Sequence, residues 1–271
     1  MTVAPVAPPV EPVGSELVPG YTVLQLAHRS RLFDVYEVWS VDRHCRCAAK
    51  VVRPDRSHEG KGQRRLMREG RLLLSLSHPN VLRAYELCQR PQSALITEAL
   101  PGMTIGYWIE EHGPLKKDDL IHLGIHVSSA LSYLHGKGVL HLDLKPGNLL
   151  ASYGIVRVID FSLWRKPGRA SRGAGTHAYL APEQARGQSI CAATDVWGLG
   201  TVLWEAAAGR PPFGRPDDDD AYEQLERRAD PIRKHRRLRA DLAEAIDACL
   251  DPEPSGRPSL RELSELLDSL L

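Results

Sequence analysis

The chain has 271 residues, of which 42% are hydrophobic and 25% are charged, and its formal net charge at pH 7 is +1. This length fits one two-lobed domain or two ordinary domains, and the composition is that of a globular protein that can bury a core. The small net charge gives no reason to expect a nucleic acid or an anionic membrane surface as a partner. The sequence lacks the apolar run of ~18 residues that a membrane helix needs, so we expect no membrane segment.

The cysteines are five in number and scattered along the chain. An odd, dispersed set argues against a disulfide framework and for a reducing compartment, which we expect to be the cytoplasm. Cys45 and Cys47 form a Cys-x-Cys pair. A structural zinc site takes about four ligands, so we expect both cysteines on a strand rather than on a metal.

Residues 1–19 hold five prolines and almost no charge. Proline denies its segment regular backbone hydrogen bonding, so we expect a disordered or extended tail there. The folded domain is then expected over residues 20–271.

Apolar and polar residues alternate in a β-like pattern between Tyr21 and Val52, where we expect three strands, and again over residues 81–87 and 93–97. A helix-like run, Lys61–Ser77, lies between these two groups. Further along, apolar residues at i, i+3 and i+4 spacing predict a long helix; they are Leu120, Leu123, Val127, Leu131 and Leu134. The pattern predicts an α+β chain with a small β-rich part, one main helix in it, and a mainly helical remainder.

Two stretches in the second part carry chemistry. The run from Val139 to Leu150 places four polar side chains in one short loop between apolar flanks: His141, Asp143, Lys145 and Asn148. Ten residues later, a second short apolar run ends in Asp160. One acid that orients a hydroxyl, a lysine that meets a phosphate oxygen, and an amide with a second carboxylate that hold a divalent metal suit phosphoryl transfer.

At these residues the sequence resembles the eukaryotic-type protein kinase family, whose catalytic loop reads His-Arg-Asp-Leu-x-x-x-x-Asn. Further motifs recur in the family's order: Cys47-Ala-Ala-Lys50, Asp160-Phe-Ser162 and Ala181-Pro-Glu183. The resemblance covers residues 21–271 and implies a bacterial member with the two-lobed kinase fold. The N-lobe would take about residues 20–98 and the C-lobe about residues 99–271.

The resemblance implies a role for each residue of the catalytic loop. Asp143 would accept or orient the substrate hydroxyl, and Lys145 would neutralise the γ-phosphate during transfer. Asn148 and Asp160 would hold Mg²⁺. Thr176 would hydrogen-bond Asp143 and Lys145, and both Lys145 and Thr176 are features of the Ser/Thr kinases. His141 is expected to pack beside Phe161 without a direct chemical role.

The nucleotide would be ATP, held mainly from the first lobe. Lys50 would position the α- and β-phosphates while paired with Glu69, because an isolated ammonium is costly to bury. Thr97 would be the gatekeeper at the back of the pocket. The remaining residues that the resemblance assigns to the nucleotide are Val35, Ala48, Glu98, Leu100 and Leu150.

One departure from the family concerns the loop over the phosphates. Residues 27–35 contain no glycine, although glycine lets the backbone approach a phosphate closely. Arg29 or Arg31 could replace the lost amide contacts with charge, or both could be solvated loop residues.

Three smaller departures lead to hypotheses about motion and regulation. Gly70 is unfavourable within a helix by ~1 kcal/mol, so the helix could loosen and break the pair of Lys50 with Glu69. Leu142 replaces the arginine that clamps a phosphorylated activation loop, so activity should not require phosphorylation, for example at Ser171. Ser162 replaces a glycine, and its Cβ should make that loop flip less freely.

The substrate class follows from the docking loop. Glu183 would pair with Arg257, a pairing that small-molecule phosphotransferases of related fold lack, so we expect a protein with a Ser or Thr hydroxyl. Asp195 would bond the backbone of the catalytic loop, serve as a helix N-cap, or both. The basic run 227–239 is either a docking patch or a solvated face paired with nearby acids.

The function predicted from the sequence is therefore an ATP- and Mg²⁺-dependent Ser/Thr protein kinase. The alternative is a pseudokinase-like scaffold with weak or no phosphate transfer, which the glycine-free loop and Ser162 favour. A third alternative is a small-molecule phosphotransferase.

Overall fold

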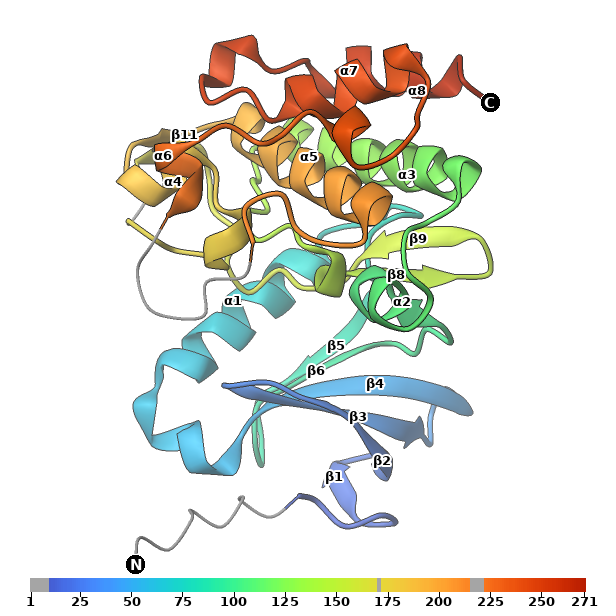
Figure 1. The fold of residues 1–271 in the computed structure, drawn as a ribbon. Helices are drawn as coiled ribbons and strands as arrows, with labels where there is room; N and C mark the ends of the chain where they lie inside the picture. Colours follow the sequence, from blue (N-terminus) through green and yellow to red (C-terminus); the bar gives the residue numbers. More distant parts are fainter. Residues whose placement is uncertain (1–9, 170–171, 215–221) are drawn as a thin grey trace, which may run out of the picture. The chain divides into compact units, whose positions relative to one another are not determined.

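We analysed a computed structural model of the chain, which describes residues 10–169, 172–214 and 222–271. The chain divides into two compact units (Figure 1). Unit 1 runs up to Ser77 and takes in Leu82–Leu100, and unit 2 comprises His78–Val81 and Pro101–Leu271. The change of unit after Leu100 lies close to the boundary expected between residues 98 and 99.

Unit 1 is built on one antiparallel sheet with the strand order β1-β2-β3-β4-β6-β5. Its strands are β1 (Glu16–Val18), β2 (Tyr21–Arg29), β3 (Phe33–Ser40), β4 (Cys45–Val52), β5 (Ala84–Cys88) and β6 (Ala94–Glu98). One face of the sheet carries the core of the unit, which includes Tyr36, Val38, Cys47, Ala49 and Val51. These residues alternate along β3 and β4 because successive side chains of a strand point to opposite faces.

One main helix completes unit 1. Helix α1 (Lys61–Leu74) follows a 3₁₀ turn, η1 (Pro54–Glu59), and is continuous through Gly70. A Cβ at Gly70 would lie 2.6 Å from a methyl carbon of Leu87 on β5. The hypothesis that Gly70 loosens the helix therefore finds no support in this structure, since the glycine lets α1 pack closely against β5.

Two expected boundaries in unit 1 are wrong. Residues 16–18 form β1 and are not part of a disordered tail, because Leu17 and Val18 lie in the core at 3% and 1% exposure. The strand expected over residues 81–87 begins only at Ala84. Val81 instead bridges to Val158 in unit 2.

Unit 2 is mainly helical, as expected. Its longest helix, α3 (Lys117–Gly136), buries the apolar residues that predicted it. The other helices are α2 (Ile105–His112), α4 (Pro182–Arg186), α5 (Ala192–Ala208), α6 (Glu223–Glu226), α7 (Ala240–Cys249) and α8 (Leu260–Asp268), with 3₁₀ turns η2 (Pro146–Asn148), η3 (His177–Tyr179), η4 (Ile232–Lys234) and η5 (Pro254–Gly256). Helix α5 is buried over most of its length, and its Trp197 stacks on Phe213 with ring centroids 5.5 Å apart.

Short strands of unit 2 position its polar loops. Strands β7 (Met103–Thr104), β8 (Leu149–Ser152) and β9 (Ile155–Val158) form one small sheet, and β10 (Gly168–Arg169) pairs with β11 (Ser189–Ile190). Together with the sheet and main helix of unit 1, this helical unit confirms the expected α+β, two-lobed fold class.

Two further findings concern the chain as a whole. Within the described ranges, no helix combines the length and the apolar character that crossing a membrane requires. All five cysteines are free thiols, and Cys45 and Cys47 lie on β4 as expected.

Candidate functional site

An ion pair in unit 1 joins the third long strand to the helix. Lys50 on β4 donates two hydrogen bonds to the carboxylate of Glu69 on α1, at 3.0 and 2.9 Å from Nζ to the two oxygens. The side chains are 15% and 1% exposed. A paired lysine of this kind keeps its charge in a partly buried place, where it can also meet an anion.

The face of the sheet that carries Lys50 also carries other residues expected to contact the nucleotide. Val35 on β3 stands opposite Lys50, and Ala48 on β4 stands opposite Thr97 on β6. These four residues lie opposite the core face, because they occupy the alternate positions of their strands. The sheet register therefore brings together side chains that the sequence separates by almost fifty residues.

Glu98 and Leu100, the last two residues of unit 1 that were predicted to contact the nucleotide, lie at its carboxyl end. The backbone N–H of Glu98 donates to the carbonyl of Arg83 at 3.0 Å. The carbonyl of Glu98 accepts from the hydroxyl of Thr97 at 3.2 Å. Leu100, the final residue of the unit, is half-buried.

The glycine-free turn between β2 and β3 uses one of its arginines internally. The guanidinium of Arg29 donates to both oxygens of Asp34, at 2.7 and 2.8 Å, and Asp34 is fully buried. Arg31 is exposed. Arg29 therefore braces the turn, which is not one of the two roles that we expected for it.

Asp143 is the centre of the polar loop in unit 2. Its Oδ1 accepts from the backbone N–H of Thr176 at 3.1 Å and from the hydroxyl of Thr176 at 2.9 Å. The amide of Asn148 donates to the backbone carbonyl of Asp143 at 2.8 Å and to its Oδ2 at 3.2 Å. The carboxylate is thus held from both sides, which fixes the direction in which it can accept a proton.

Lys145 joins the same cluster. Its Nζ donates to the hydroxyl of Thr176 at 3.0 Å and lies 3.8 Å from Oδ2 of Asp143. Its side chain is 31% exposed, so the ammonium can also meet an anion from solvent. The structure brings together the three residues that the sequence predicted to be catalytic: Asp143, Lys145 and Thr176.

The two predicted metal ligands end neighbouring segments. Asn148 closes η2 and Asp160 follows β9, and the backbone N–H of Ile159 donates to the carbonyl of Asn148 at 3.0 Å. Because the amide nitrogen of Asn148 is engaged by Asp143, its amide oxygen is left as the acceptor group. One carboxylate and one amide oxygen suit a hard cation such as Mg²⁺. Leu150, the remaining nucleotide residue, is half-buried on β8.

The backbone before Asp143 is anchored from helix α5. The carboxylate of Asp195 accepts the backbone N–H groups of His141 and Leu142 and the Nε2 of His135, each at 2.8 Å. Asp195 lies in the first turn of α5 and not at its N-cap, so of its two expected roles the structure supports the bond to the catalytic loop. His141 packs edge-on against Phe161 with centroids 5.0 Å apart, which confirms the expected packing role.

The predicted link between Glu183 and Arg257 is present. Arg257 donates to both carboxylate oxygens, at 2.8 and 2.9 Å, and both side chains are almost fully buried. The hydroxyl of Thr194 donates to the same carboxylate at 2.8 Å. This pair fixes α4 against the segment that precedes α8.

Ser162 and Leu142 differ from the family pattern in structurally different ways. The backbone of Ser162 does not adopt a positive φ, so its Cβ causes no strain there. Its N–H donates to Oδ1 of Asp160 at 2.9 Å. Leu142 has a φ of 67° and packs with Leu140 and Ile190 in a small apolar cluster. An apolar contact to β11 thus stands where the family has a charged clamp.

Two buried glutamines hold the loops of unit 2, and the sequence analysis missed both. Gln184 donates to the carbonyls of Leu142 and Ala174, at 2.8 and 2.9 Å. Gln224 donates to the carbonyls of His177 and Leu180, at 2.9 and 3.0 Å. For Gln184 the sequence signal was its place directly after the Ala-Pro-Glu motif, which by itself is uninformative, and Gln224 had no such signal.

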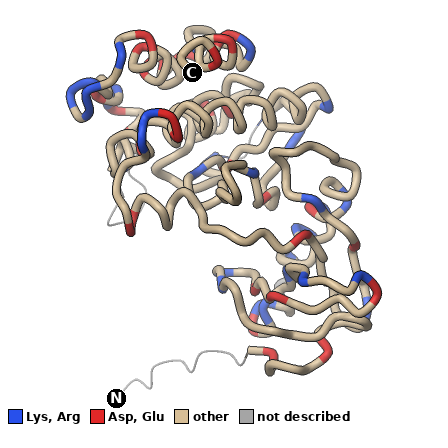
Figure 2. Tube along the Cα trace, turned by 90° about the vertical axis from the view of Figure 1, so that its right-hand side faces the viewer, with Lys and Arg blue, Asp and Glu red and all other residues tan. Residues whose placement is uncertain are grey.

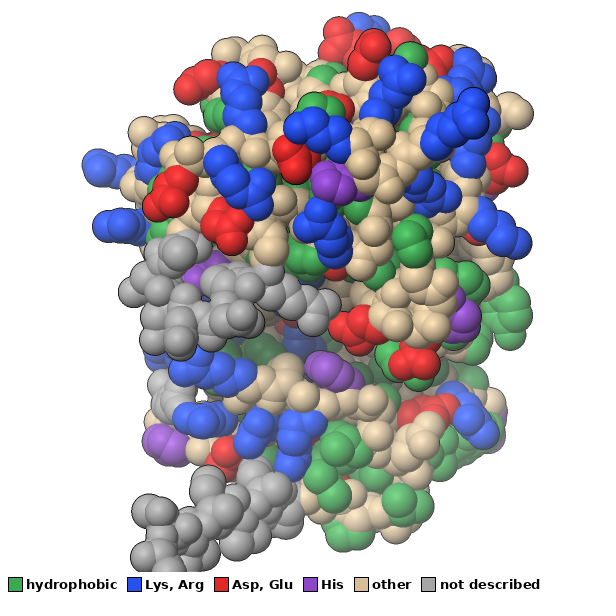
Figure 3. All heavy atoms as spheres, in the orientation of Figure 1, with side chains coloured by type: hydrophobic (Ala, Val, Ile, Leu, Met, Phe, Trp, Pro, Cys, Tyr) green, Lys and Arg blue, Asp and Glu red, His purple; other side chains and the backbone are tan. Residues whose placement is uncertain are grey.

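The basic run is largely paired. Lys234 contacts Asp230 at 3.2 Å and Arg239 contacts Asp241 at 2.7 Å. Figure 2 shows that cationic and acidic residues are interspersed along both units, and the face of unit 2 drawn in Figure 3 carries both signs side by side. Burial lowers the pKa of Arg236, which donates to a backbone carbonyl. These contacts favour the reading of a solvated, paired face, while the acidic run 217–220 lies outside the described residues.

Comparison with known proteins gives a consistent result. The family model described as "Protein kinase domain" matches residues 32–267. The chain is 33% identical over 234 residues to the serine/threonine-protein kinase PkaA of Streptomyces coelicolor. The aligned region covers 80% of this chain and 41% of that protein.

Other relatives carry the same kind of name. The serine/threonine-protein kinase PknB of Mycobacterium leprae is 30% identical over 240 residues, 83% of this chain and 38% of that protein. PknB of Mycobacterium tuberculosis is 32% identical over 231 residues, 79% of this chain and 37% of that protein. The chain spans about two fifths of the length of the curated relatives that it matches.

Proposed function

Because the chain belongs to the protein kinase domain family, we propose that it transfers the γ-phosphoryl group of ATP to a Ser or Thr hydroxyl of a protein. The single observation that carries the proposal is the cluster around Asp143, in which Thr176 and Lys145 meet one carboxylate. The hydroxyl of Thr176 donates to Asp143 and accepts from Lys145. This arrangement is the one expected of the Ser/Thr class of protein kinases. The names of the relatives support the same class.

In this proposal each residue has one task. Asp143 accepts the hydroxyl proton as the new bond from the substrate oxygen to the γ-phosphorus forms and the bond from that phosphorus to the leaving oxygen of ADP breaks. Lys145 lowers the cost of charge on the transferred phosphoryl group. Asn148 and Asp160 would hold Mg²⁺, which neutralises phosphate charge when bound.

Unit 1 would contribute the remaining contacts to the nucleotide. Lys50, held by Glu69, would meet the phosphates, and Val35 and Ala48 would pack on the adenine ring. The shared face of the sheet supports this assignment. Glu98, Leu100 and Leu150 complete the proposed set.

The second candidate is a scaffold that transfers phosphate weakly or not at all. The observation that favours it is the turn at residues 30–33, which holds side chains and internal hydrogen bonds where a glycine loop would cover phosphates. The intact pair of Lys50 with Glu69 and the complete set around Asp143 favour the kinase over the scaffold.

The decisive experiment measures transfer from labelled ATP with Mg²⁺ to a generic basic protein, with Asp143→Asn as control. A kinase gives a signal that falls by about a hundredfold or more in the variant, the usual size of a lost general base. A signal that persists in the variant comes from a contaminating kinase. Absence of any signal, together with unchanged thermal stability on addition of Mg²⁺ and ATP, would reject the proposal.

We also propose that the protein works in a reducing compartment such as the cytoplasm. The five free thiols support this placement.

A further inference from the structure

Phe33 lies on the same face of the sheet as the proposed phosphate lysine. It is the first residue of β3, two positions before Val35, and Val35 stands opposite Lys50 on β4. A residue two positions from a cross-strand partner is a diagonal neighbour, within reach of an aromatic side chain. The ring centroid of Phe33 lies 4.7 Å from Nζ of Lys50, and Phe33 is 6% exposed.

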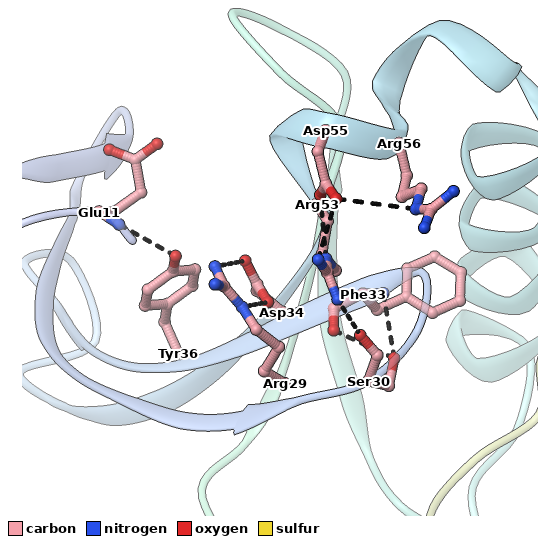
Figure 4. A network of polar contacts seen from close by, with 9 residues as sticks. All are labelled: Glu11, Arg29, Ser30, Phe33, Asp34, Tyr36, Arg53, Asp55 and Arg56. Carbon is pink, nitrogen blue, oxygen red and sulfur yellow. Dashed lines mark hydrogen bonds and ion pairs between the residues drawn. The ribbon is translucent and has the colours of Figure 1, made fainter. Parts of the chain in front are cut away.

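The turn that carries Phe33 is braced by charged side chains (Figure 4). Arg29 is paired with Asp34, on the other side of the strand from the Phe33 ring. From the end of β4, Arg53 donates to the carbonyl of Ser30 at 3.0 Å and is itself paired with Asp55 at 2.9 and 3.0 Å. The pair of Arg29 with Asp34 links β2 to β3, and Arg53 links Ser30 in the turn to the segment after β4.

Two backbone amides of the turn, those of Ser30 and Phe33, are engaged within it. The N–H of Ser30 donates to the carbonyl of Phe33 at 2.8 Å, and the N–H of Phe33 donates to the hydroxyl of Ser30 at 3.0 Å. An amide that already has a partner loses that bond when it turns to a phosphate, so its net contribution to binding is small. The position of Phe33 is that of the third glycine in the pattern G-x-G-x-x-G-x-V, if Val35 is its valine.

The ring and a phosphate compete for the same ammonium. A phosphate oxygen must approach Nζ to about 2.8 Å for a charge-assisted hydrogen bond. Two hydrogen bonds to Glu69 and the face of the Phe33 ring already surround this group, whose side chain is 15% exposed. A phosphate can bind there only after the ring has moved, which loses a cation–π contact and exposes an apolar side chain.

We propose that Phe33 shields Lys50 from phosphate, so that the proposed contact of Lys50 with the phosphates of ATP forms only after the ring has moved away. ATP then gains little affinity over adenosine from its phosphates. The inference rests on the proposed function, since it assumes that ATP binds on this face of the sheet. It makes Phe33 a residue that sets the preference for ATP over adenosine.

The test compares the affinities of Mg·ATP and adenosine by calorimetric titration in the wild type and two variants. In the wild type the two ligands should bind within about tenfold of each other. Phe33→Gly removes the ring and should strengthen ATP binding about tenfold or more, the size of one hydrogen bond to a charged group, with adenosine unchanged. Phe33→Leu keeps an apolar side chain without the aromatic ring, so its affinity for ATP should lie between those of the wild type and Phe33→Gly.

Three controls isolate the effect. Arg46→Ala changes a residue of β4 whose side chain is 67% exposed, and it should leave both affinities unchanged. The double variant Phe33→Gly with Lys50→Ala should lose the gain for ATP, because the gain depends on the ammonium. In protein labelled with ¹³C-lysine, the ε-methylene signal of Lys50 should be shifted by the ring current in the wild type and not in Phe33→Leu.

The outcomes separate the two proposals. Either of two results overturns the shielding by Phe33 and leaves the kinase function intact. One is a wild type that binds ATP well over tenfold more tightly than adenosine, and the other is the absence of a gain for ATP in Phe33→Gly. Failure of every variant to bind any nucleotide overturns the proposed function and the inference with it. An unshifted Lys50 signal in the wild type contradicts the contact itself.

Discussion

Burial decides how much each charged pair of this protein contributes to stability. Glu69 is 1% exposed and its partner Lys50 is 15% exposed, whereas Glu37 pairs with an arginine, Arg46, that is 67% exposed. Removing one partner of a buried pair leaves an uncompensated charge, but an exposed pair is screened by water. At the residue scale, similar pairings therefore have different energetic consequences.

Glu69→Ala should lower the free energy of unfolding by ~3 kcal/mol, because it leaves the ammonium of Lys50 without its counter-charge. Glu37→Ala, the matched control, should cost less than ~1 kcal/mol. Urea denaturation followed by circular dichroism measures both. Equal losses in the two variants would contradict the assignment of Glu69 to a buried pair.

Gln184→Ala should reduce phosphate transfer more than it reduces stability. The variant loses the hydrogen bonds from Gln184 to the carbonyls of Leu142 and Ala174, which tie the residue before Asp143 to α4, and this costs ~2 kcal/mol of stability. Looser positioning of the carboxylate should lower kcat by about tenfold or more. The control is Gln188→Ala, an exposed glutamine of the same segment, for which initial rates should match the wild type.

At the scale of the element, α1 shows how packing overrides helix propensity. Gly70 is a poor helix former, yet the helix continues through it because the side chain of Leu87 fills the space beside it. The hypothesis of a loosened helix follows from propensity alone. The close approach of α1 to β5 could be known only from the folded unit.

Gly70→Ala should destabilise the protein by about 1–3 kcal/mol, because overpacking against Leu87 outweighs the gain of ~1 kcal/mol in helix propensity. The matched control is Gly136→Ala at the end of α3, where an added Cβ meets nothing within 4 Å. That variant should be neutral or slightly stabilised. A stabilised Gly70→Ala, measured by thermal unfolding, would show that the helix has room.

Helix α8 begins with a reciprocal cap that makes its stability depend on pH. Glu262 accepts from the hydroxyl and the backbone N–H of Ser259, and these bonds hold the pKa of Glu262 below its usual value of 4.5. A lowered folded-state pKa stabilises the fold at pH values above the unfolded pKa. The stabilisation is lost as the pH falls through the folded-state pKa.

Glu262→Gln should therefore flatten the fall in stability between about pH 5 and pH 3. The comparison is Glu265→Gln on the same helix, whose carboxylate lies 4.0 Å from Arg261 on an exposed face. Denaturation midpoints at a series of pH values give both curves. Parallel curves for the wild type and Glu262→Gln would contradict the role of the cap.

At the scale of the whole molecule, the contacts of Leu142 bear on regulation. The apolar cluster of Leu142 with Leu140 and Ile190 ties the catalytic loop to β11. Strand β11 pairs with β10, which lies in the stretch 165–176 that the family resemblance assigns to the activation segment. No phosphate is needed for an apolar contact, whereas an arginine clamp needs one.

Phosphatase-treated protein and Ser171→Ala should therefore keep phosphate transfer within about twofold of the untreated wild type. Ser171 itself lies outside the described residues. Initial rates on one protein substrate provide the measurement. A large loss of rate in Ser171→Ala would show that a phosphate orders the segment in spite of Leu142.

The family, the order of the elements and most of the residues proposed for the chemistry could be predicted from the amino-acid sequence. Asp143, Lys145 and Asn148 are close in the chain, whereas Val35, Ala48 and Lys50 were assigned from the family resemblance, and their shared face became clear from the sheet register. Such features depend on short covalent spacing, which fixes direction and period before any long-range contact forms.

The contacts of the unusual residues became clear only from the folded units. Arg29 pairs with Asp34, and Leu87 occupies the space that a side chain at Gly70 would need. Gln184 donates to a carbonyl 42 positions away, and the ring of Phe33 lies against the ammonium of Lys50. These outcomes depend on which distant side chains meet in the folded units. Local propensity and periodicity carry no information about such meetings, because they describe each segment without its neighbours in space.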